Sequence, residues 1–234
     1  VKFFHNFSKF ARFLLSSKCY NRTMLTLLKN FFTVLILSSS INLWSDENPY
    51  NFIDSNAQKM VIVLKENKSL FLEDRQLYEQ KIKEIFEPMI DFRRVAATVM
   101  GKKYYLASSK EQRAEFVVIF KDSLLDTYAE TLAQWENQTI TTIFPKNMEI
   151  QTNNLKNIEV QQTLNTGSSK YPISYKLRKN KDNSWSIVNI IVNGVNLGLT
   201  FRNQFQALAI KNNGNIESTL NGWVSDAGDA GISG

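Results

Sequence analysis

Cysteine and histidine are almost missing from this 234-residue sequence, which contains one of each, Cys19 and His5. Both precede Asp46, so residues 46–234 have neither. No disulfide can form within that part of the chain, even in an oxidising compartment that would allow one. A Cys–His pair, a Ser–His–Asp triad and a histidine-containing metal site are excluded there too. We therefore expect neither a metal nor a cofactor.

Acidic residues are missing from residues 1–45, which carry six of the 28 basic residues. The formal net charge of +6 at first suggests a negatively charged partner, such as a nucleic acid or a membrane surface. Without those six cations, 22 basic residues remain against 22 acidic ones. A nucleic-acid-binding protein needs a surplus of cations to displace counterions from phosphates. The distribution of charge thus argues against a nucleic-acid partner.

The start of the chain has the composition of a secretory signal peptide. Lys29 precedes an apolar run at residues 31–37, and serines follow at residues 38–40. This order of charge, apolar run and small residues is typical of a leader that is cleaved after export, here after Ser40 or Ser45. An uncleaved anchor is the alternative, but the apolar stretch is shorter than the roughly 20 residues of a spanning helix. We therefore expect an exported protein.

The predicted leader spans residues 1–45, and two interpretations stay open for residues 1–23. They are either a genuine extension or lie upstream of a true start at Met24. Lys18 precedes Cys19, where a lipoprotein signal requires a small residue, so Cys19 is not interpreted as a lipid attachment site. No later run is long enough to span a bilayer, and we expect the mature protein to be soluble.

The first half of the domain that we expect at residues 46–224 has apolar residues at helical spacing. Pro88 breaks this pattern, Asp91 is a suitable N-cap for the next helix, and Gly101 suits the end of that helix. In residues 108–111 a serine is followed by a glutamate three positions later, and this capping box predicts the start of a long helix.

The second half of the domain changes toward a period of two, which predicts strands. Residues 173–177 alternate apolar and polar side chains, residues 180–183 have the composition of a turn, and residues 185–192 form another apolar segment. We expect these segments to form an antiparallel hairpin. A helix is predicted at residues 197–211, and a disordered tail at residues 225–234.

Six short blocks stand in a fixed order behind the predicted signal peptide. They are residues 48–50 (NPY), 91–105 (DFRRVAATVMGKKYY), 109–116 (SKEQRAEF), 185–189 (WSIVN), 193–197 (NGVNL) and 201–205 (FRNQF). Their order and spacing resemble the MlaC family of periplasmic phospholipid-binding proteins, also known for toluene tolerance. The resemblance covers residues 48–223. Residues 1–23 have no counterpart, and from Ser225 the chain lacks the lysine-rich helical end expected of the family.

The resemblance implies an α+β protein, in which a curved antiparallel sheet of the NTF2-like type lies beside a helical subdomain with a lipid cavity between them. It implies a phospholipid carrier rather than an enzyme. Its partners would be an outer-membrane lipoprotein–porin complex and an inner-membrane ABC transporter complex, between which it shuttles lipid to maintain outer-membrane asymmetry. Burying each CH₂ of an acyl chain is worth about 0.8 kcal/mol, so one chain contributes on the order of 10 kcal/mol.

The apolar faces of helices and strands are the candidates for contact with acyl chains. Val195 and Leu197 are the strongest of them, since they follow Gly194 at a strand end, where a sheet opens toward its mouth. For the helical residues, ordinary core packing is the alternative. The candidate apolar lipid-binding residues are Phe92, Val95, Val99, Met100, Phe116, Phe120, Leu124, Ile173, Tyr175, Leu177, Ile187, Ile190, Val195 and Leu197.

Tyr104, Tyr105 and Arg202 complete the lipid-binding candidates, at the mouth of the cavity. A tyrosine suits a wet boundary because its ring is apolar and its hydroxyl polar, although a core contact at a helix end is the alternative. Arg202 suits a lipid phosphate, with a surface salt bridge as the alternative.

Two other functions stay open. A small-molecule-binding enzyme of NTF2-like fold needs a general base in an apolar cavity, and acids such as Asp91 and Glu159 are available, although none lies on a predicted cavity-facing strand position. A periplasmic chaperone or interaction protein would instead have a filled core and an exposed apolar groove.

Overall fold

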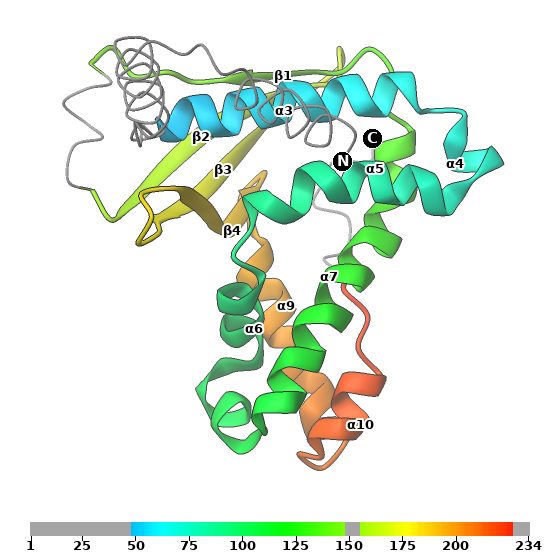
Figure 1. Cartoon of the computed structure of the whole chain (residues 1–234), viewed down its shortest axis with the longest axis vertical. Coiled ribbons are helices and arrows are strands. Elements are labelled where there is room, and N and C mark those ends of the chain that lie inside the picture. The colour runs from blue at the N-terminus through cyan, green and yellow to red at the C-terminus, as the bar shows by residue number, and fades with distance from the viewer. Residues whose placement is uncertain (1–47, 148–154, 227–234) are drawn as a thin grey trace, which may run out of the picture. The chain divides into compact units, whose positions relative to one another are not determined.

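The computed structural model describes residues 48–147 and 155–226, which form an α+β fold (Figure 1). The elements are α3 (Pro49–Glu66), α4 (Leu70–Glu73), α5 (Arg75–Met89), α6 (Phe92–Ala107), α7 (Lys110–Ala133), β1 (Thr139–Thr142), β2 (Asn157–Asn165), β3 (Lys170–Lys179), β4 (Trp185–Val192), β5 (Val195–Asn196), α9 (Leu197–Lys211) and α10 (Ile216–Asn221). The predicted fold class is confirmed, and the open antiparallel sheet is consistent with the NTF2-like type. The predicted leader lies outside the described residues.

Several helices begin where the sequence predicts, because local caps define these positions. The Asp91 carboxylate accepts a hydrogen bond from the backbone N–H of Arg94 at 3.0 Å and caps α6. Asn48 caps α3 through the N–H of Tyr50 at 2.9 Å. The helix predicted at residues 197–211 is confirmed as α9.

Pro88 does not end its helix, so that prediction is wrong. Helix α5 continues to Met89, with Pro88 in its last turn. Because proline has no backbone N–H, Pro88 removes one intrahelical hydrogen bond, and the helix ends one residue later.

The predictions at the two ends of the α6–α7 connection also need correction. Gly101 has a φ of 69°, as a helix-ending glycine would, but the chain returns to helix and α6 ends only at Ala107. The capping box lies one residue later than predicted. Ser109 Oγ accepts from Gln112 N at 3.1 Å, and Gln112 Oε1 accepts from Ser109 N at 3.0 Å. Two adjacent serines fit the same motif, and the sequence alone does not separate them.

The five strands follow their sequence order across one antiparallel sheet. The predicted hairpin is confirmed as β3–β4, closed by a hydrogen bond from Asn180 N to Ser184 O at 2.8 Å. Its turn contains Asn183 with a φ of 66°, a conformation that asparagine tolerates better than most residues.

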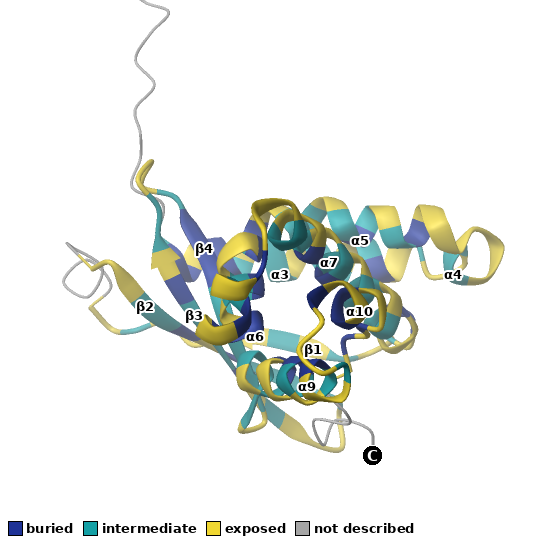
Figure 2. Ribbon diagram, turned by 90° about the horizontal axis from the view of Figure 1, so that it is seen from below, coloured by how far each residue is buried: buried dark blue, intermediate teal, exposed yellow. Residues whose placement is uncertain are grey.

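Buried apolar residues form three clusters, and Figure 2 marks the buried positions in dark blue along the helices and strands. The helical cluster joins α6, α7, α9 and α10. The sheet cluster lies between α3, α5 and strands β2 to β4. A third cluster joins α3, α5 and α7. The sheet and the helical group therefore have separate cores that meet where β4 contacts α5, α6 and α9.

The folded part extends one residue beyond the predicted domain. Ser225 is fully buried, its N–H donates to Ser123 Oγ at 2.6 Å, and its hydroxyl accepts from Trp223 Nε1 at 3.1 Å. The rest of the predicted tail, residues 227–234, lies outside the described residues. Within residues 48–147 and 155–226, no helix is both long and apolar enough to cross a bilayer.

Candidate functional site

The predicted sheet residues share one face of the sheet. Cross-strand partners point to the same side, and the register pairs Tyr175 with Ile190 and Leu177 with Ile187. Ile187 and Ile190 are three positions apart, so simple alternation would place them on opposite faces. An irregularity in the register between Lys176 and Leu177 adds one residue on β4 and returns both isoleucines to the inner face.

The inner face is closed at one end and partly open at the other. Leu177 and Ile187 are fully buried against α3 and α5, and Ile173 is nearly so. Tyr175 and Ile190 are only half-buried at the edge of the sheet cluster. Burial raises the pKa of the Tyr175 phenol, so its hydroxyl stays protonated at neutral pH. Two apolar side chains of the inner face thus keep surface that a ligand can cover.

The predicted helical residues form an aromatic core. Phe116 lies 4.9 Å from Phe205 and 5.5 Å from Trp223, ring centroid to ring centroid, and Phe120 lies 5.5 Å from Phe201. The remaining fully packed members of the predicted set are Phe92, Val99 and Met100. These side chains contact one another in the structure. For them, the alternative of ordinary core packing describes the structure better than contact with a ligand. Val95 and Leu124 of the helical candidates are half-buried, as are Tyr105 and Leu197.

The three residues predicted at the mouth have different surroundings. Tyr104 is buried and packs edge-to-face on Phe205, with 5.9 Å between ring centroids, so it is a core contact here. Tyr105 is half-buried beneath the Arg113 guanidinium, which lies 4.1 Å from its ring centroid. Arg202 is exposed and lies beside Gly101.

The sheet cluster and the helical cluster meet at a junction of half-buried residues around Ile90. Ile90 packs against both clusters and forms an isolated parallel bridge with Ile187. The N–H of Asp91 donates to Ile187 O at 3.1 Å and fixes the start of α6 against β4. We call junction the following half-buried apolar side chains: Ile90, which packs against both clusters; Val95, Leu124 and Leu197, which pack against the helical cluster; Tyr175 and Ile190, which pack against the sheet cluster; and Val195, which pairs with Val192 at the end of β4.

Polar contacts hold the start of α9 at this junction. Asn189 donates to Asn196 Oδ1 at 2.9 Å, and its own Oδ1 accepts from Gly198 N at 3.0 Å. A Cβ on Gly198 would lie 2.5 Å from Asn189 Oδ1, so this approach of helix and strand requires glycine. The position of Leu197 is thereby fixed relative to β4.

Sequence reasoning missed several residues of these surfaces. Ile90 lies immediately before the N-cap Asp91, and Val95 is the fourth residue of α6. Apolar residues at these two positions form a hydrophobic staple, and that local signal would have identified Ile90. Trp223 is packed among the rings of α7 and α9, far away in sequence, and no local pattern predicts that contact.

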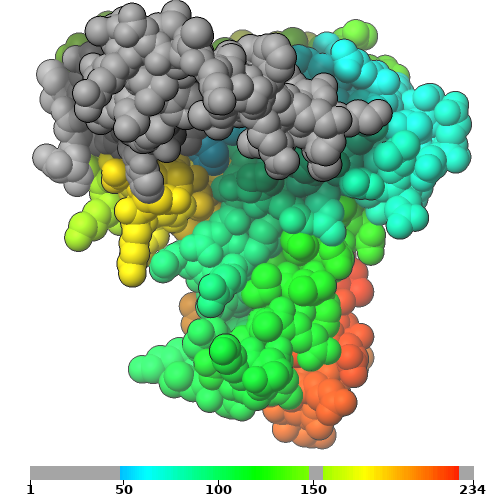
Figure 3. Space-filling model, in the orientation of Figure 1, coloured from blue at the N-terminus to red at the C-terminus, as the bar shows by residue number. Residues whose placement is uncertain are grey.

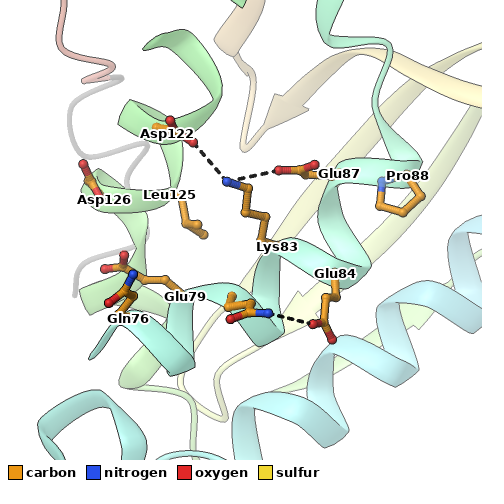
Figure 4. Close-up of a pocket in the computed structure, with 10 residues that line it drawn as sticks. Gln76, Glu79, Lys83, Glu84, Glu87, Pro88, Asp122, Leu125 and Asp126 are labelled. Carbon is orange, nitrogen blue, oxygen red and sulfur yellow. Dashed lines mark hydrogen bonds and ion pairs between the residues drawn. The ribbon is translucent and has the colours of Figure 1, made fainter. Parts of the chain in front are cut away.

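One hollow in the described part of the chain is a groove of about 630 Å³ between α5 and α7 (Figure 4). Lys83 Nζ lies across it, 3.2 Å from Asp122 and 3.4 Å from Glu87, and Lys121 also pairs with Glu87 at 2.9 Å. Its other carboxylates are Glu79, Glu84 and Asp126. An acyl chain here would take charged groups out of water, so the groove does not suit a lipid tail.

A smaller hollow, about 140 Å³, is lined by the row formed by Gln161, Ser174 and Ile191, and also by the predicted lipid-binding residue Ile173 of the adjacent row. The row of Gln161 alternates with that of Tyr175 and Ile190, so it belongs to the outer face of the sheet. Neither hollow is lined by a junction residue.

The two acids considered for catalysis have other roles. Asp91 caps α6 and pairs with Arg94 at 3.1 Å. Glu159 lies on the outer face of the sheet, where hydrogen bonds from Lys176 and Ser174 lower its pKa to about 2. Glu159 is therefore ionised at neutral pH and is not a base for the interior. No group of three or more potential metal ligands occurs within residues 48–147 and 155–226.

Comparison with known proteins places this architecture in context. A family model described as MlaC protein matches residues 54–225. The toluene tolerance protein ttg2D of Pseudomonas putida is 26% identical over 207 residues, which cover 88% of this chain and 94% of that protein. The intermembrane phospholipid transport system binding protein MlaC of Haemophilus influenzae is 25% identical over 211 residues, covering 88% and 89% of the two chains.

A solved structure shares the fold. The phospholipid-binding protein of Ralstonia solanacearum, determined in complex with a phospholipid, superposes with a TM-score of 0.66 at 22% identity. The match covers 75% of this chain and 94% of that one.

Proposed function

The chain belongs to the MlaC family, and from that premise we propose that it is a phospholipid carrier that holds acyl chains at the junction. The observation that carries the proposal is the pair of separate apolar cores joined by half-buried side chains. A carrier needs an apolar interior that opens between two stable parts, and no catalytic group is required. The relatives named for phospholipid transport and phospholipid binding support the same ligand.

Acyl chains would enter by separating β4 and its neighbours from the helical cluster. The fully packed aromatic core of α6, α7 and α9 then serves as a rigid wall, and the junction supplies the contact surface. Each methylene that leaves water contributes about 0.8 kcal/mol, so a single chain supplies enough free energy to displace a few half-buried contacts. Among the residues predicted from the sequence, those that we propose to contact an acyl chain are therefore Val95, Leu124, Tyr175, Ile190, Val195 and Leu197.

Transport adds a location and partners to this proposal. We propose export through a leader at residues 1–45, with the carrier domain following from Asp46. In the periplasm the protein would exchange phospholipid with an outer-membrane lipoprotein–porin complex and an inner-membrane ABC transporter complex, and so maintain outer-membrane asymmetry. Arg202 as a contact for the lipid phosphate stays a prediction.

Native mass spectrometry of the chain from Asp46 onward, with lipid extraction of the same sample, tests the ligand. We expect about one phospholipid per chain after expression in a Gram-negative host. A folded protein that carries no lipid and takes none from phospholipid vesicles would overturn the proposal.

A further inference from the structure

The connection between α6 and α7 concentrates positive charge at one end of the helical group. We call residues 102–113 the helical tip. It carries Lys102, Lys103, Lys110 and Arg113 against a single acid, Glu111. Hydrogen bonds from the N-terminal turn of α7 and from Ser109 lower the pKa of Glu111, so that acid is ionised at neutral pH. The tip therefore has a formal net charge of +3 within a domain whose residues from 46 onward are formally neutral.

Gly101 separates the tip from the rest of α6. Its φ of 69° and ψ of 162° interrupt the helix, so residues 102–107 form a turn with a new direction. The Arg202 and Gln206 side chains of α9 lie against this glycine, where an added Cβ would come within 3.3 Å of each. The tip is thus a distinct unit that lies at the lower end of the views in Figures 1 and 3.

Arg113 holds the tip in one conformation. Its Nη2 donates to Ser108 O at 2.7 Å and its Nε to Ser108 Oγ at 3.2 Å. Its guanidinium also stacks on Tyr105, and the Ser109–Gln112 capping box fixes the first turn of α7. A preorganised loop loses little conformational freedom when it binds a surface.

The charged groups of the tip face solvent together with an aliphatic side chain. Lys102, Lys103 and Lys110 are exposed, and within residues 48–147 and 155–226 no carboxylate forms an ion pair with them. Leu106 lies between them in sequence and is 65% exposed. Leu106 thus stands among lysines and next to Tyr105 in the sequence. Cations together with apolar and aromatic side chains favour binding at the interface of a negatively charged bilayer.

We infer that the helical tip is a contact site for an anionic lipid surface, with the lysines on the headgroups and Leu106 inserted among the acyl chains. An acidic protein partner would use the same cations, but a bilayer also offers an apolar region to Leu106, which stands beside them in the sequence. The inference is independent of lipid carriage, because docking on a bilayer and loading of the interior are separate measurements.

Vesicle co-sedimentation tests the inference. The probes are phosphatidylcholine vesicles with and without a minor fraction of phosphatidylglycerol. We expect the protein to bind the anionic vesicles preferentially, and the binding to weaken as salt is added. Each basic residue near such a surface is worth about a fivefold change in partitioning, so the double variant Lys102→Gln/Lys103→Gln should bind about 25-fold more weakly. Leu106→Ser should weaken binding to both kinds of vesicle.

Matched variants elsewhere on the surface serve as controls. Lys59→Gln/Lys181→Gln removes two exposed lysines from α3 and from the β3–β4 turn, and Leu72→Ser removes a leucine that is 89% exposed on α4. These variants should bind vesicles as the unchanged protein does. Equal losses in tip and control variants would overturn the inference, as would no preference for anionic vesicles. Loss of binding only to an acidic protein, with vesicle binding intact, would assign the tip to a protein partner instead.

Lipid carriage is measured in the same samples. The tip variants should retain the co-purified phospholipid of the unchanged protein, because no junction residue is altered. A protein that docks on anionic vesicles but never carries lipid would refute the proposed function and leave the inference standing.

Discussion

In the proposed function, single side chains at the junction decide whether an acyl chain can enter. Val195 pairs with Val192 at the end of the sheet, and Leu197 follows it at the start of α9. Both are half-buried, which leaves part of each side chain for a ligand. The account therefore depends on apolar chemistry at a few positions rather than on any reactive group.

Val195→Glu is expected to abolish phospholipid loading, because a carboxylate in the apolar interior must be desolvated when an acyl chain covers it. Loading is measured as lipid phosphorus per protein after purification. Val118→Glu is the matched control, since Val118 is 53% exposed on α7, and it should load normally. A folded Val195→Glu protein with normal lipid content would remove Val195 from the site.

Glu159 links stability to pH. Its folded pKa of about 2, lowered by Lys176 and then Ser174, lies below the roughly 4.3 of an unfolded glutamate. The stabilisation of the fold by ionised Glu159 is therefore present above pH ~4.3 and is lost as the pH falls toward about 2. The side chains of Glu159 and Lys176 are 36% and 42% exposed, so solvent screens their interaction. Glu159 therefore adds only about 0.5 to 1 kcal/mol to the free energy of unfolding.

Glu159→Gln should lower the free energy of unfolding by about 0.5 to 1 kcal/mol at pH 7. The variant and the unchanged protein should become equally stable as the pH approaches about 2. Urea unfolding at several pH values measures the difference. Glu115→Gln, at an exposed position of α7, is the control. A difference that persists at the lowest pH would contradict the assigned cause.

Helix ends show how local signals position whole elements. The Ser109–Gln112 capping box satisfies two backbone donors at the start of α7, the longest of the described helices. Ser69 occupies the corresponding position before α4 but makes no side-chain cap. The two serines are therefore a matched pair.

Ser109→Ala should destabilise the protein by about 1 kcal/mol, since a backbone donor loses its partner. Ser69→Ala should change stability by less than about 0.5 kcal/mol. Thermal or urea unfolding of both variants checks the contrast. Equal effects would show that the capping box adds nothing to the stability of the fold.

The sequence predicted elements whose signals are local and missed features that depend on distant contacts. Helix α9 and strand β4 were predicted with their bounds, and strand β3 was predicted over its middle part, because asparagine- and glycine-containing turns flank these elements. The strand irregularity that places Ile187 and Ile190 on one face has no such signal. Which phenylalanines fill a core and which line a junction depends on tertiary packing, so the predicted site contained both kinds.

The protein as a whole is interpreted as two apolar cores that separate to admit lipid. The described residues from Asn48 to Asp226 belong to one unit, so opening requires movement within it. The bridge between Ile90 and Ile187 joins the start of the helical group to β4. Fixing this bridge should keep the junction closed.

Ile90→Cys/Ile187→Cys is expected to block phospholipid uptake when oxidised and to recover it when reduced. Bridge partners lie close enough for a disulfide, and residues 46–234 contain no other cysteine to interfere. Uptake from labelled vesicles is measured before and after reduction, with each single cysteine variant as control. If the oxidised double variant loads lipid at the normal rate, lipid does not enter by separation of Ile90 from Ile187.

Photo-crosslinking within lipid-loaded protein tests the location of the acyl chains most directly. A photoreactive residue is placed at Leu197 in the junction or at Leu125 in the groove between α5 and α7, and adducts are identified by mass spectrometry. We expect a covalent phospholipid adduct at Leu197 and none at Leu125. An adduct at Leu125 with none at Leu197 would contradict the proposed location of the acyl chains.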